Sequence, residues 1–588
     1  MSGSNTVVGR GSDAIAAALK RSGVKVVFGL CGHGDLALLD AFVESGIQFI
    51  SCHHEQVAVH AADAYYRVSG RPGVVVTTLG PGMTNTVTGL ADAALDSSAV
   101  MVISGDVPNR YVGLGAYQEL DLHGDDEQAS ITRAVTKRAF RVLEPEALAR
   151  TIVRAWDVML AGCPGPVHVH VPLDFLTVRG SYAFPDLAVS RPPALAADTV
   201  RDIVDAIGNA QRPVLYLGGG ALVARAGEAA LRLAEKLHIP IATSMVAQGV
   251  LPEDHPLALG FTGAVGTSPA NSAVNQADLL IAVGTRFPEM DASSWRTESF
   301  LQPARCRLIQ IDIEPREFGR VYTPDIAAVA DARVALGQIA EAAREQSGRG
   351  DYLATIDALK GKWAGQLEEA QRDTAFPMQP PRVLRELRRV LPADAVLVAG
   401  VGVRHMVGQH YPVLRPGGML VASGFSTMGW ETGAALGAKV AAGSRPVVGL
   451  IGDGAFNSTV SALSTAVAYD VPVVWVVLDN LGYQSIAVYQ DRHFGRRTGT
   501  DFELATGGRY EIDYVALARS YGADGVSVDA ADALGPALEG ALATGRNFLV
   551  HVPTAGRVKA RASGQWDVNK ITAGEPEIVP APLAGGMQ

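Results

Sequence analysis

GLIGDGAFNSTVSALSTAVAYDVPVVWVVLDNLGYQSI, residues 449–486, contains two apolar strands with a helical pattern between them. The first strand ends in Gly452-Asp453-Gly454 and the second in Asp479-Asn480, and a helix is predicted from about Asn457. In an open parallel sheet, ligands bind beyond the carboxyl ends of the strands, where loops meet helix N-termini. This stretch therefore predicts a doubly wound α/β domain with a ligand site at two neighbouring strand ends.

The residues at these strand ends suit a phosphate ligand and a hard metal ion. Gly452 and Gly454 let backbone N–H groups approach an anion closely, and the following helix adds the positive end of its dipole. Mg²⁺ prefers carboxylate, amide carbonyl and phosphate oxygens. Asp453, the amide oxygen of Asn480 and a backbone carbonyl of the turn at Gly482 are the predicted metal ligands. Taken singly, the glycines and Asn480 would also fit ordinary turns.

This arrangement resembles the signature of thiamine diphosphate (ThDP) enzymes, in which GDG is followed, one helix and one strand later, by Asn. The resemblance implies further cofactor contacts at Ala455, Ser485 and Ile486. It also implies a carboxylate on another domain. Residues 51–85, SCHHEQVAVHAADAYYRVSGRPGVVVTTLGPGMTN, resemble the pyrimidine-binding segment of these enzymes.

By this resemblance, Glu55 is the acid that hydrogen-bonds the aminopyrimidine ring of the cofactor, and Gly80 and Asn85 of the GPG-x-TN turn contact the cofactor. In SGFSTMGWETGAALGAKVA, residues 423–441, Met428 corresponds to the bulky residue beneath the cofactor, and the Ser426 carbonyl accepts from its amino group. Read without the resemblance, Glu55 is a helix-start carboxylate and Met428 a core filler.

Two relatives within the family differ in reaction. Acetolactate synthases share HEQ, GPG-x-TN, AYQE at residues 116–119, Lys137 and TMG with this chain. Their VGQH, which contacts the diphosphate, reads VGVR here and ends in Arg404, a replacement able to make a charge-assisted contact. Their RFDDRV reads RFPEMD, so the arginine that holds the acceptor carboxylate becomes Met290, and their pocket tryptophan becomes Tyr489.

The second relative is the trihydroxycyclohexanedione hydrolase of inositol breakdown. It resembles this chain at GHG, residues 32–34, at GFSTMGWETGAALGAKVA, at TRF…ASS ending in Ser294, and at DYVALARSYGA. This chain lacks the longer N-terminal part and the insertions of that hydrolase. The reaction predicted from the resemblance is C–C bond formation or cleavage on a 2-oxo acid, ketone or aldehyde, with hydrolysis of a cyclic 1,2-dione as the alternative.

Candidate substrate-facing residues lie on two loops. His33 follows the first apolar strand of its domain and suits proton transfer to an alkoxide, although a surface or capping role fits as well. Gln118 is a candidate hydrogen-bond donor to substrate, and His53, His54 and His123 are weaker candidates for the role of His33. The glycines of GGGAL, residues 218–222, could admit FAD, as in acetolactate synthases, or simply make a strand-to-helix turn.

The rest of the chain predicts three doubly wound parallel-sheet domains, because short apolar runs alternate with helical patterns. The runs expected to be strands are KVVFGL, IQFISC, GVVVTTLG, AVMVISG and PVHVHVP in the first domain, PVLYLGGG, IPIATS, DLLIAVG and CRLIQIDI in the second, and AVLVAGVG, MLVASG, PVVGLIGDG, PVVWVVLDN and FLVHVP in the third. The predicted bounds are 1–185 for the pyrimidine-binding domain, 195–345 for a Rossmann-like central domain and 375–560 for the diphosphate-binding domain. A polar helical connector is expected between about Asp331 and Arg372, and residues 561–588, rich in Ala, Pro and Gly, are expected to form a loosely ordered tail.

Composition narrows the class of protein. The net charge of −10 is spread thinly, without the Lys/Arg cluster that nucleic-acid binding requires. The four cysteines lack the spacing of a zinc site or a disulfide scaffold, and no secretory leader or apolar run long enough for a membrane span occurs. We therefore expect a cytoplasmic enzyme without nucleic-acid or membrane partners. The family resemblance implies a homodimer or homotetramer with active sites between subunits.

Overall fold

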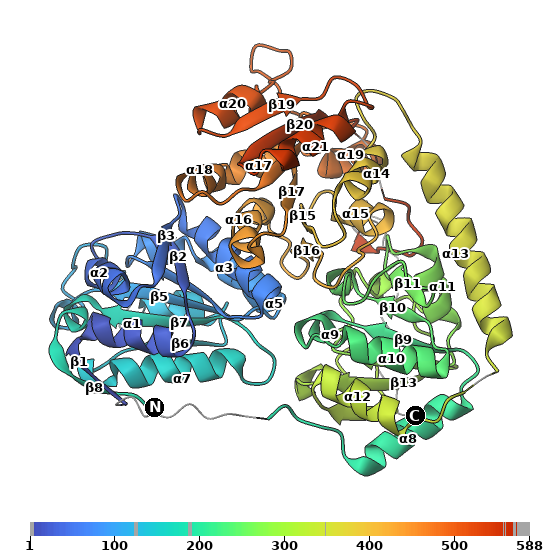
Figure 1. The fold of residues 1–588 in the computed structure, drawn as a ribbon, viewed down its shortest axis with the longest axis horizontal. Coiled ribbons are helices and arrows are strands. Elements are labelled where there is room, and N and C mark those ends of the chain that lie inside the picture. The colour runs from blue at the N-terminus through green and yellow to red at the C-terminus, as the bar shows by residue number, and fades with distance from the viewer. Residues whose placement is uncertain are drawn as a thin grey trace.

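The structure is a computed structural model of the 588-residue chain, and it describes residues 5–120, 122, 127–185, 191–346, 348–556, 558, 560–568 and 572. Three six-stranded parallel sheets, each covered by helices, occupy three successive parts of the chain (Figure 1). This confirms the predicted fold class of three doubly wound domains.

The N-terminal sheet has the strand order β3-β2-β4-β5-β7-β6. Its strands are β2 (Val26–Leu30), β3 (Gln48–Ser51), β4 (Gly73–Thr77), β5 (Val100–Asp106), β6 (Arg138–Arg141) and β7 (Val167–Pro172). Its helices are α1 (Gly11–Arg21), α2 (Leu36–Ser45), α3 (Glu55–Ser69), α4 (Pro81–Thr84), α5 (Val87–Leu95), α6 (Glu127–Arg133) and α7 (Leu148–Leu160). An antiparallel pair outside this sheet, β1 (Thr6–Arg10) with β8 (Arg179–Ala183), joins the two ends of the domain.

The central sheet has the order β11-β10-β9-β12-β13-β14. Its strands are β9 (Pro213–Leu217), β10 (Ile241–Thr243), β11 (Ala258–Phe261), β12 (Leu279–Val283), β13 (Arg307–Asp312) and β14 (Ile326–Val329). Its helices are α8 (Ala197–Asn209), α9 (Gly219–Val223), α10 (Gly227–Leu237), α11 (Ser268–Gln276) and α12 (Ala332–Ala342). Numbered within the domain, the order is 3-2-1-4-5-6, which is the dinucleotide-binding Rossmann order.

The C-terminal sheet has the order β16-β15-β17-β18-β20-β19. Its strands are β15 (Val396–Ala399), β16 (Met419–Val421), β17 (Val447–Gly452), β18 (Val474–Asp479), β19 (Asp524–Ser527) and β20 (Phe548–Pro553). Its helices are α14 (Pro380–Val390), α15 (Arg404–His410), α16 (Trp430–Ala442), α17 (Asp453–Thr459), α18 (Ser461–Ala468), α19 (Gln484–Phe494), α20 (Tyr514–Ser520) and α21 (Leu534–Ala543). Within its domain this order matches that of the N-terminal sheet.

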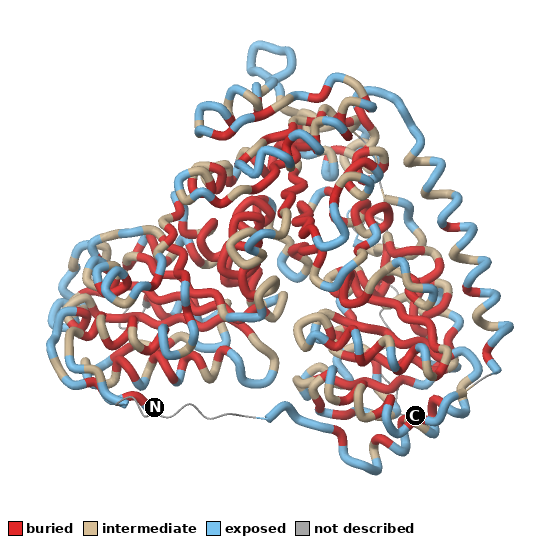
Figure 2. The backbone as a smooth tube through the Cα atoms, viewed as in Figure 1, coloured by how far each residue is buried: buried red, intermediate tan, exposed pale blue. Residues whose placement is uncertain are grey.

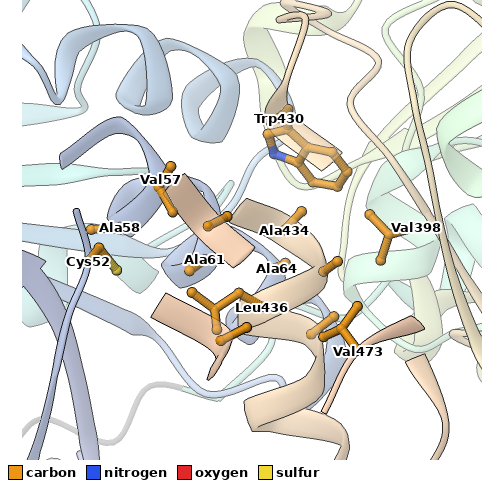
Figure 3. Close-up of a cluster of buried hydrophobic side chains, with 14 of the residues drawn as sticks. Cys52, Val57, Ala58, Ala61, Ala64, Val398, Trp430, Ala434, Leu436 and Val473 are labelled. Atoms are coloured by element: carbon orange, nitrogen blue, oxygen red, sulfur yellow. The ribbon is translucent and has the colours of Figure 1, made fainter. Parts of the chain in front are cut away.

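The N- and C-terminal domains share one hydrophobic core, because α3 packs against α16 (Figures 1 and 3). Gly437 of α16 makes the close approach possible: a Cβ there would lie 1.8 Å from the carbonyl oxygen of Ala61. Trp430 anchors the start of α16, and its Nε1 donates to Asp63 Oδ2 at 2.8 Å. The strand interiors and this helix pair are buried, whereas much of α13 (Gly350–Gln371), the connector, is exposed (Figure 2).

Two local predictions are wrong. The helix after GDG begins at Asp453 instead of near Asn457, because Gly452 is the extended N-cap and an acid in the first turn favours the helix. The tail predicted to be loose is docked over residues 561–568, whereas its remaining residues, apart from Thr572, lie outside the described part of the chain. Ser563 Oγ donates to Gly266 O at 2.6 Å, Gly564 N donates to Ala264 O at 3.1 Å, and Asp567 pairs with Arg296 at 2.7 Å.

Candidate active site

The ends of β17 and β18 converge on one carboxylate, Asp453. Its Oδ1 accepts from Gly454 N at 2.7 Å, and its Oδ2 accepts from Asn480 N and Gly482 N, each at 3.1 Å. The side-chain Oδ1 of Asn480 is buried and has no hydrogen-bond partner among the described residues. A buried acceptor without a donor requires an explanation. An amide oxygen beside a carboxylate is the donor set that Mg²⁺ takes, so these residues fit the predicted metal.

Gly452 and Gly454 differ in what a side chain at each position would contact. A Cβ at Gly454 would lie 2.4 Å from the Tyr483 ring, so packing within the protein excludes a side chain there. A Cβ at Gly452 would meet no described atom within 4 Å, so packing in the described part of the chain does not require glycine at this position. Close approach of the protein backbone to a ligand would explain the glycine. Nearby, Ala455 is buried in α17, and Ser485 and Ile486 are exposed on the first turn of α19.

A second carboxylate, Asp479, lies beside Asp453 and was not among the predicted site residues. Burial, together with the hydrogen bond to Asp479, raises the pKa of Asp453. Asp479 Oδ2 is also 3.0 Å from His551 Nε2, and His551 Nδ1 is 2.9 Å from Ser527 Oγ. The adjacency of Asp479 to Asn480 was the available signal in the sequence, whereas nothing in the sequence pointed to His551, a strand apart.

Glu55 begins α3 and is 4% exposed. Asn85 Nδ2 donates to its Oε2 at 2.9 Å, and a Cβ at Gly82 would lie 3.2 Å from its Oε1. The structure thus brings Glu55 together with the GPG-x-TN turn. Gly80 has φ 57°, and its N–H donates to Gln128 Oε1 at 2.8 Å. Gln128 is a buried residue that sequence reasoning missed, because its position in a polar helix carries no signal.

The candidate substrate-facing residues of the loops differ in burial and in contacts. A Cβ at Gly80 would lie 2.6 Å from the backbone oxygen of Gln118, and Gln118 Oε1 is buried without a hydrogen-bond partner in the described part of the chain. His33 is exposed, and its ring lies 5.3 Å from the Tyr117 ring. His54 is the N-cap of α3 and accepts from Gln56 N, while His53 is exposed. His123 lies outside the described residues.

The loop between β16 and α16 carries Ser426 and Met428. Met428 is 43% exposed, so it is not a core filler. Ser426 has a left-handed backbone, φ 63°. Arg404 is 8% exposed, and its Nη1 donates to Ala422 O at 2.6 Å and to Ser426 Oγ at 2.7 Å. The guanidinium predicted to contact a diphosphate is therefore directed to this loop.

Comparison with known proteins identifies the family. Three family profiles match: the N-terminal TPP binding domain of thiamine pyrophosphate enzymes at residues 9–127, the central domain at 200–339 and the C-terminal TPP binding domain at 400–552. The chain is 34% identical to a probable acetolactate synthase large subunit of Methanocaldococcus jannaschii over 92% of this chain and 91% of that protein. It is 33% identical to an acetolactate synthase large subunit of Corynebacterium glutamicum over 90% of this chain and 84% of that protein. The chain belongs to the acetolactate synthase-like thiamine diphosphate enzymes.

A cavity of about 990 Å³ lies where the three domains of this thiamine diphosphate enzyme meet. It is lined by Arg67 and Asp96 of the N-terminal domain, Gly220 and Asp291 of the central domain, and Arg404 and Ser426 of the C-terminal domain. Its volume is at the upper end of the roughly 300–1,000 Å³ of small-molecule and cofactor sites. Within the GGGAL run, Gly218 and Gly220 also permit close packing on Gly284, which is the turn role that the sequence left open.

Two of the departures from acetolactate synthases, Met290 and Arg404, line this cavity. Met290 lines it, and the neighbouring Glu289 is held by Ser294 Oγ at 2.7 Å and by Trp566 Nε1 at 3.2 Å. The Trp566 ring lies 5.9 Å from the Tyr489 ring. The docked tail therefore connects the central domain to α19. Among the described residues, no helix could span a membrane, and no group of three His, Cys, Asp or Glu could hold a metal.

Proposed function

We propose that the protein is a ThDP- and Mg²⁺-dependent carboligase or lyase, which makes or breaks a C–C bond next to a carbonyl of a 2-oxo acid or ketone. The cradle around Asp453 carries this proposal: one carboxylate fixed by three backbone N–H groups beside the unpartnered amide oxygen of Asn480. Asp453, Asn480 and the Gly482 carbonyl would hold the metal, and the N–H groups near Gly452 and Gly454 would hold the diphosphate.

Bound ThDP supplies an electron sink for the carbanion that C–C cleavage generates. The chain supplies orientation and proton handling. Asn85 Nδ2 donates to Oε2 of Glu55, so Oε1 is the oxygen that would accept or share a proton with the aminopyrimidine ring. Burial of the carboxyl keeps water from competing for that contact. Ser426 would accept from the amino group through its carbonyl, and Met428 would support the rings from below.

In this proposal, the residue at position 290 determines which acceptor substrate is favoured. Without a guanidinium at position 290, a second 2-oxo acid loses its bidentate partner, so the favoured acceptor is an aldehyde or ketone without a carboxylate. The same observation supports the second candidate, hydrolysis of a cyclic 1,2-dione, in which water or a proton replaces the acceptor. His33 would then transfer a proton to a substrate oxygen, and Gln118 would donate a hydrogen bond to one.

Three incubations with ThDP and Mg²⁺ distinguish these reactions: pyruvate alone, pyruvate with an aldehyde, and cyclohexane-1,2-dione. We expect product with the aldehyde or with the dione and little acetolactate from pyruvate alone. Met290→Arg is the matched variant and should raise acetolactate formation. Acetolactate formed by the wild type at the highest rate of the three would refute the acceptor assignment.

The proposal extends to the assembly and the second cofactor. The three-domain cavity would take FAD or a related nucleotide, since it lies beside the carboxyl end of β9 in a Rossmann-ordered sheet. The unit would be a homodimer or homotetramer, with Glu55 of one chain meeting the Asp453 cradle of another. Its four free thiols suit a cytoplasmic location.

A further inference from the structure

Ser426 adopts a backbone conformation that a residue with a Cβ rarely takes. Its φ of 63° lies in the left-handed region, which glycine occupies without cost and serine does not. This is also the residue whose carbonyl the proposed function assigns to the amino group of the cofactor. Something in the chain must hold Ser426 there, since the surrounding structure has to over-determine an unfavourable backbone angle.

The Ser426 hydroxyl is held both as a donor and as an acceptor. Its hydroxyl donates to Ser423 O at 2.8 Å and accepts from Arg404 Nη1 at 2.7 Å. The same Nη1 donates to Ala422 O at 2.6 Å. One guanidinium nitrogen from the start of α15 therefore ties the residue after β16 to Ser426, and it closes the intervening turn.

Burying the charged guanidinium of Arg404 costs desolvation free energy that a purely structural hydrogen bond would not require. It is 92% buried, and no carboxylate lies within ion-pair distance of it among the described residues. Burial lowers the pKa of its guanidinium, against the opposing influence of Asp291, Asp96 and Glu431. A neutral donor could bond one hydroxyl and one carbonyl without the desolvation of a charge. Arg404 and Ser426 also both line the three-domain cavity, so this contact lies at the cavity surface.

We propose that Arg404 is a positioning residue, which fixes Ser426 in its left-handed conformation and thereby presets residues 423–428 for the aminopyrimidine ring of ThDP. This inference rests on the proposed function for the identity of the ligand. Arg404 acts through Ser426 and need not touch the diphosphate itself.

The test is a double-mutant cycle with Arg404→Gln and Ser426→Ala, together with Ser426→Gly and Arg404→Lys. Two quantities are measured: the Kd for ThDP with excess Mg²⁺, by calorimetry, and the amide hydrogen exchange of residues 423–428 in the protein without cofactor. R404Q and S426A should each raise the Kd about tenfold and speed exchange, and the double variant should be no worse than either single one.

Glycine supplies the discriminating control. S426G should bind ThDP within about threefold of wild type, because glycine takes the left-handed angle freely, and R404Q should cost little in that background. Arg404→Lys, which keeps a donor, should recover part of the loss. A merely structural arginine would damage the S426G background as much as the wild type.

Additive losses in the double variant, or unchanged exchange in R404Q, would overturn the proposal. If R404Q does not fold, S426A and R404K carry the same comparison. Failure of the proposed function is distinguishable: wild-type protein would then bind no ThDP, while the exchange measurements, made without cofactor, would still report whether Arg404 controls the loop.

Discussion

At the scale of single residues, Glu55 and Asn85 form one half of the proposed site. The carboxyl is almost fully buried, and one oxygen is already bonded to Asn85, so little beyond the other oxygen is available to a ligand. Glu55→Gln should leave ThDP binding within a few-fold, because the amide keeps the shape and one acceptor. Turnover should fall by about 10²–10⁴, the usual range for a lost acid–base group. Calorimetry and steady-state kinetics check the two expectations, and full activity in this variant would remove Glu55 from its role.

Glu431, in the first turn of α16, gives a pH-dependent prediction. Burial raises the pKa of this carboxyl to about 7, whereas its ordinary value is 4.5. The folded state therefore binds the proton more tightly than the unfolded state. The stability that Glu431 contributes is complete below about pH 4.5 and is lost as the pH rises through about 7.

Glu431→Gln removes this dependence because the amide does not titrate. The variant should match wild type near pH 5 and exceed it near pH 8, by up to about 3 kcal/mol at about 1.4 kcal/mol per pKa unit. Thermal unfolding of both proteins at the two pH values measures the difference. An offset that is the same at both pH values would contradict the assignment.

Some proposed site residues could be predicted from the sequence because they directly follow apolar runs that form strands. Asp453 and Asn480 are each adjacent to a buried apolar run, and parallel strands must bring such ends together. Asp479–His551 and Gln128–Gly80 could not be found this way, since each pairs residues from separate elements whose register no local pattern specifies. The contact between Arg404 and Ser426 belongs to the same class, and without coordinates Arg404 looked like a phosphate ligand.

At the scale of elements, the strands that sequence analysis missed share a position. β6, β11, β14 and β19 are each the outermost strand of their sheet. Each of these four strands has only four residues and one neighbouring strand, so its sequence pattern is short. β3 and β16 are outermost as well, but the apolar runs IQFISC and MLVASG made them predictable. The antiparallel pair of β1 with β8 was missed for another reason, because its partners lie at opposite ends of the domain.

The contact between α3 and α16 gives a stability prediction with an internal control. A Cβ at Gly437 would lie 1.8 Å from a backbone oxygen that cannot move freely, so Gly437→Ala should destabilise the protein by about 1–3 kcal/mol. Gly365, in exposed α13, has nothing within 4 Å of its Cβ position. Gly365→Ala should stabilise by about 0.5–1 kcal/mol, because alanine restricts the unfolded chain. Denaturant unfolding should move the two midpoints in opposite directions, and equal shifts would contradict the packing argument.

At the scale of the whole molecule, the N- and C-terminal sheets have the same strand order and the central sheet a different one. Of the three similar units expected from sequence, two share a topology, as an old duplication would leave. Each of these two carries half of the proposed site. The halves have exposed apolar residues, Tyr117 on one and Ile486 and Met428 on the other. Among the described residues, no hydrogen bond joins Glu55 to the Asp453 cradle, which suits a site completed by a second chain.

Subunit complementation tests this arrangement. Glu55→Gln and Asp453→Ala chains, each inactive alone, are produced together with different tags, and the hybrid dimers are isolated. If each site takes Glu55 from one chain and Asp453 from the other, a hybrid holds one intact site and should regain about half of the wild-type activity. Hybrids that stay inactive would place both residues of a site in the same chain.

The central claim is that the tips of β17 and β18 hold a magnesium diphosphate, and titration calorimetry with ThDP tests it most directly. The wild-type protein should give saturable heat with ThDP in Mg²⁺ and none after chelation of the metal, and Asp453→Ala should abolish the signal while the protein stays folded. A folded wild-type protein that gives no heat with ThDP and Mg²⁺, or an Asp453→Ala variant that binds as tightly as wild type, would contradict the account.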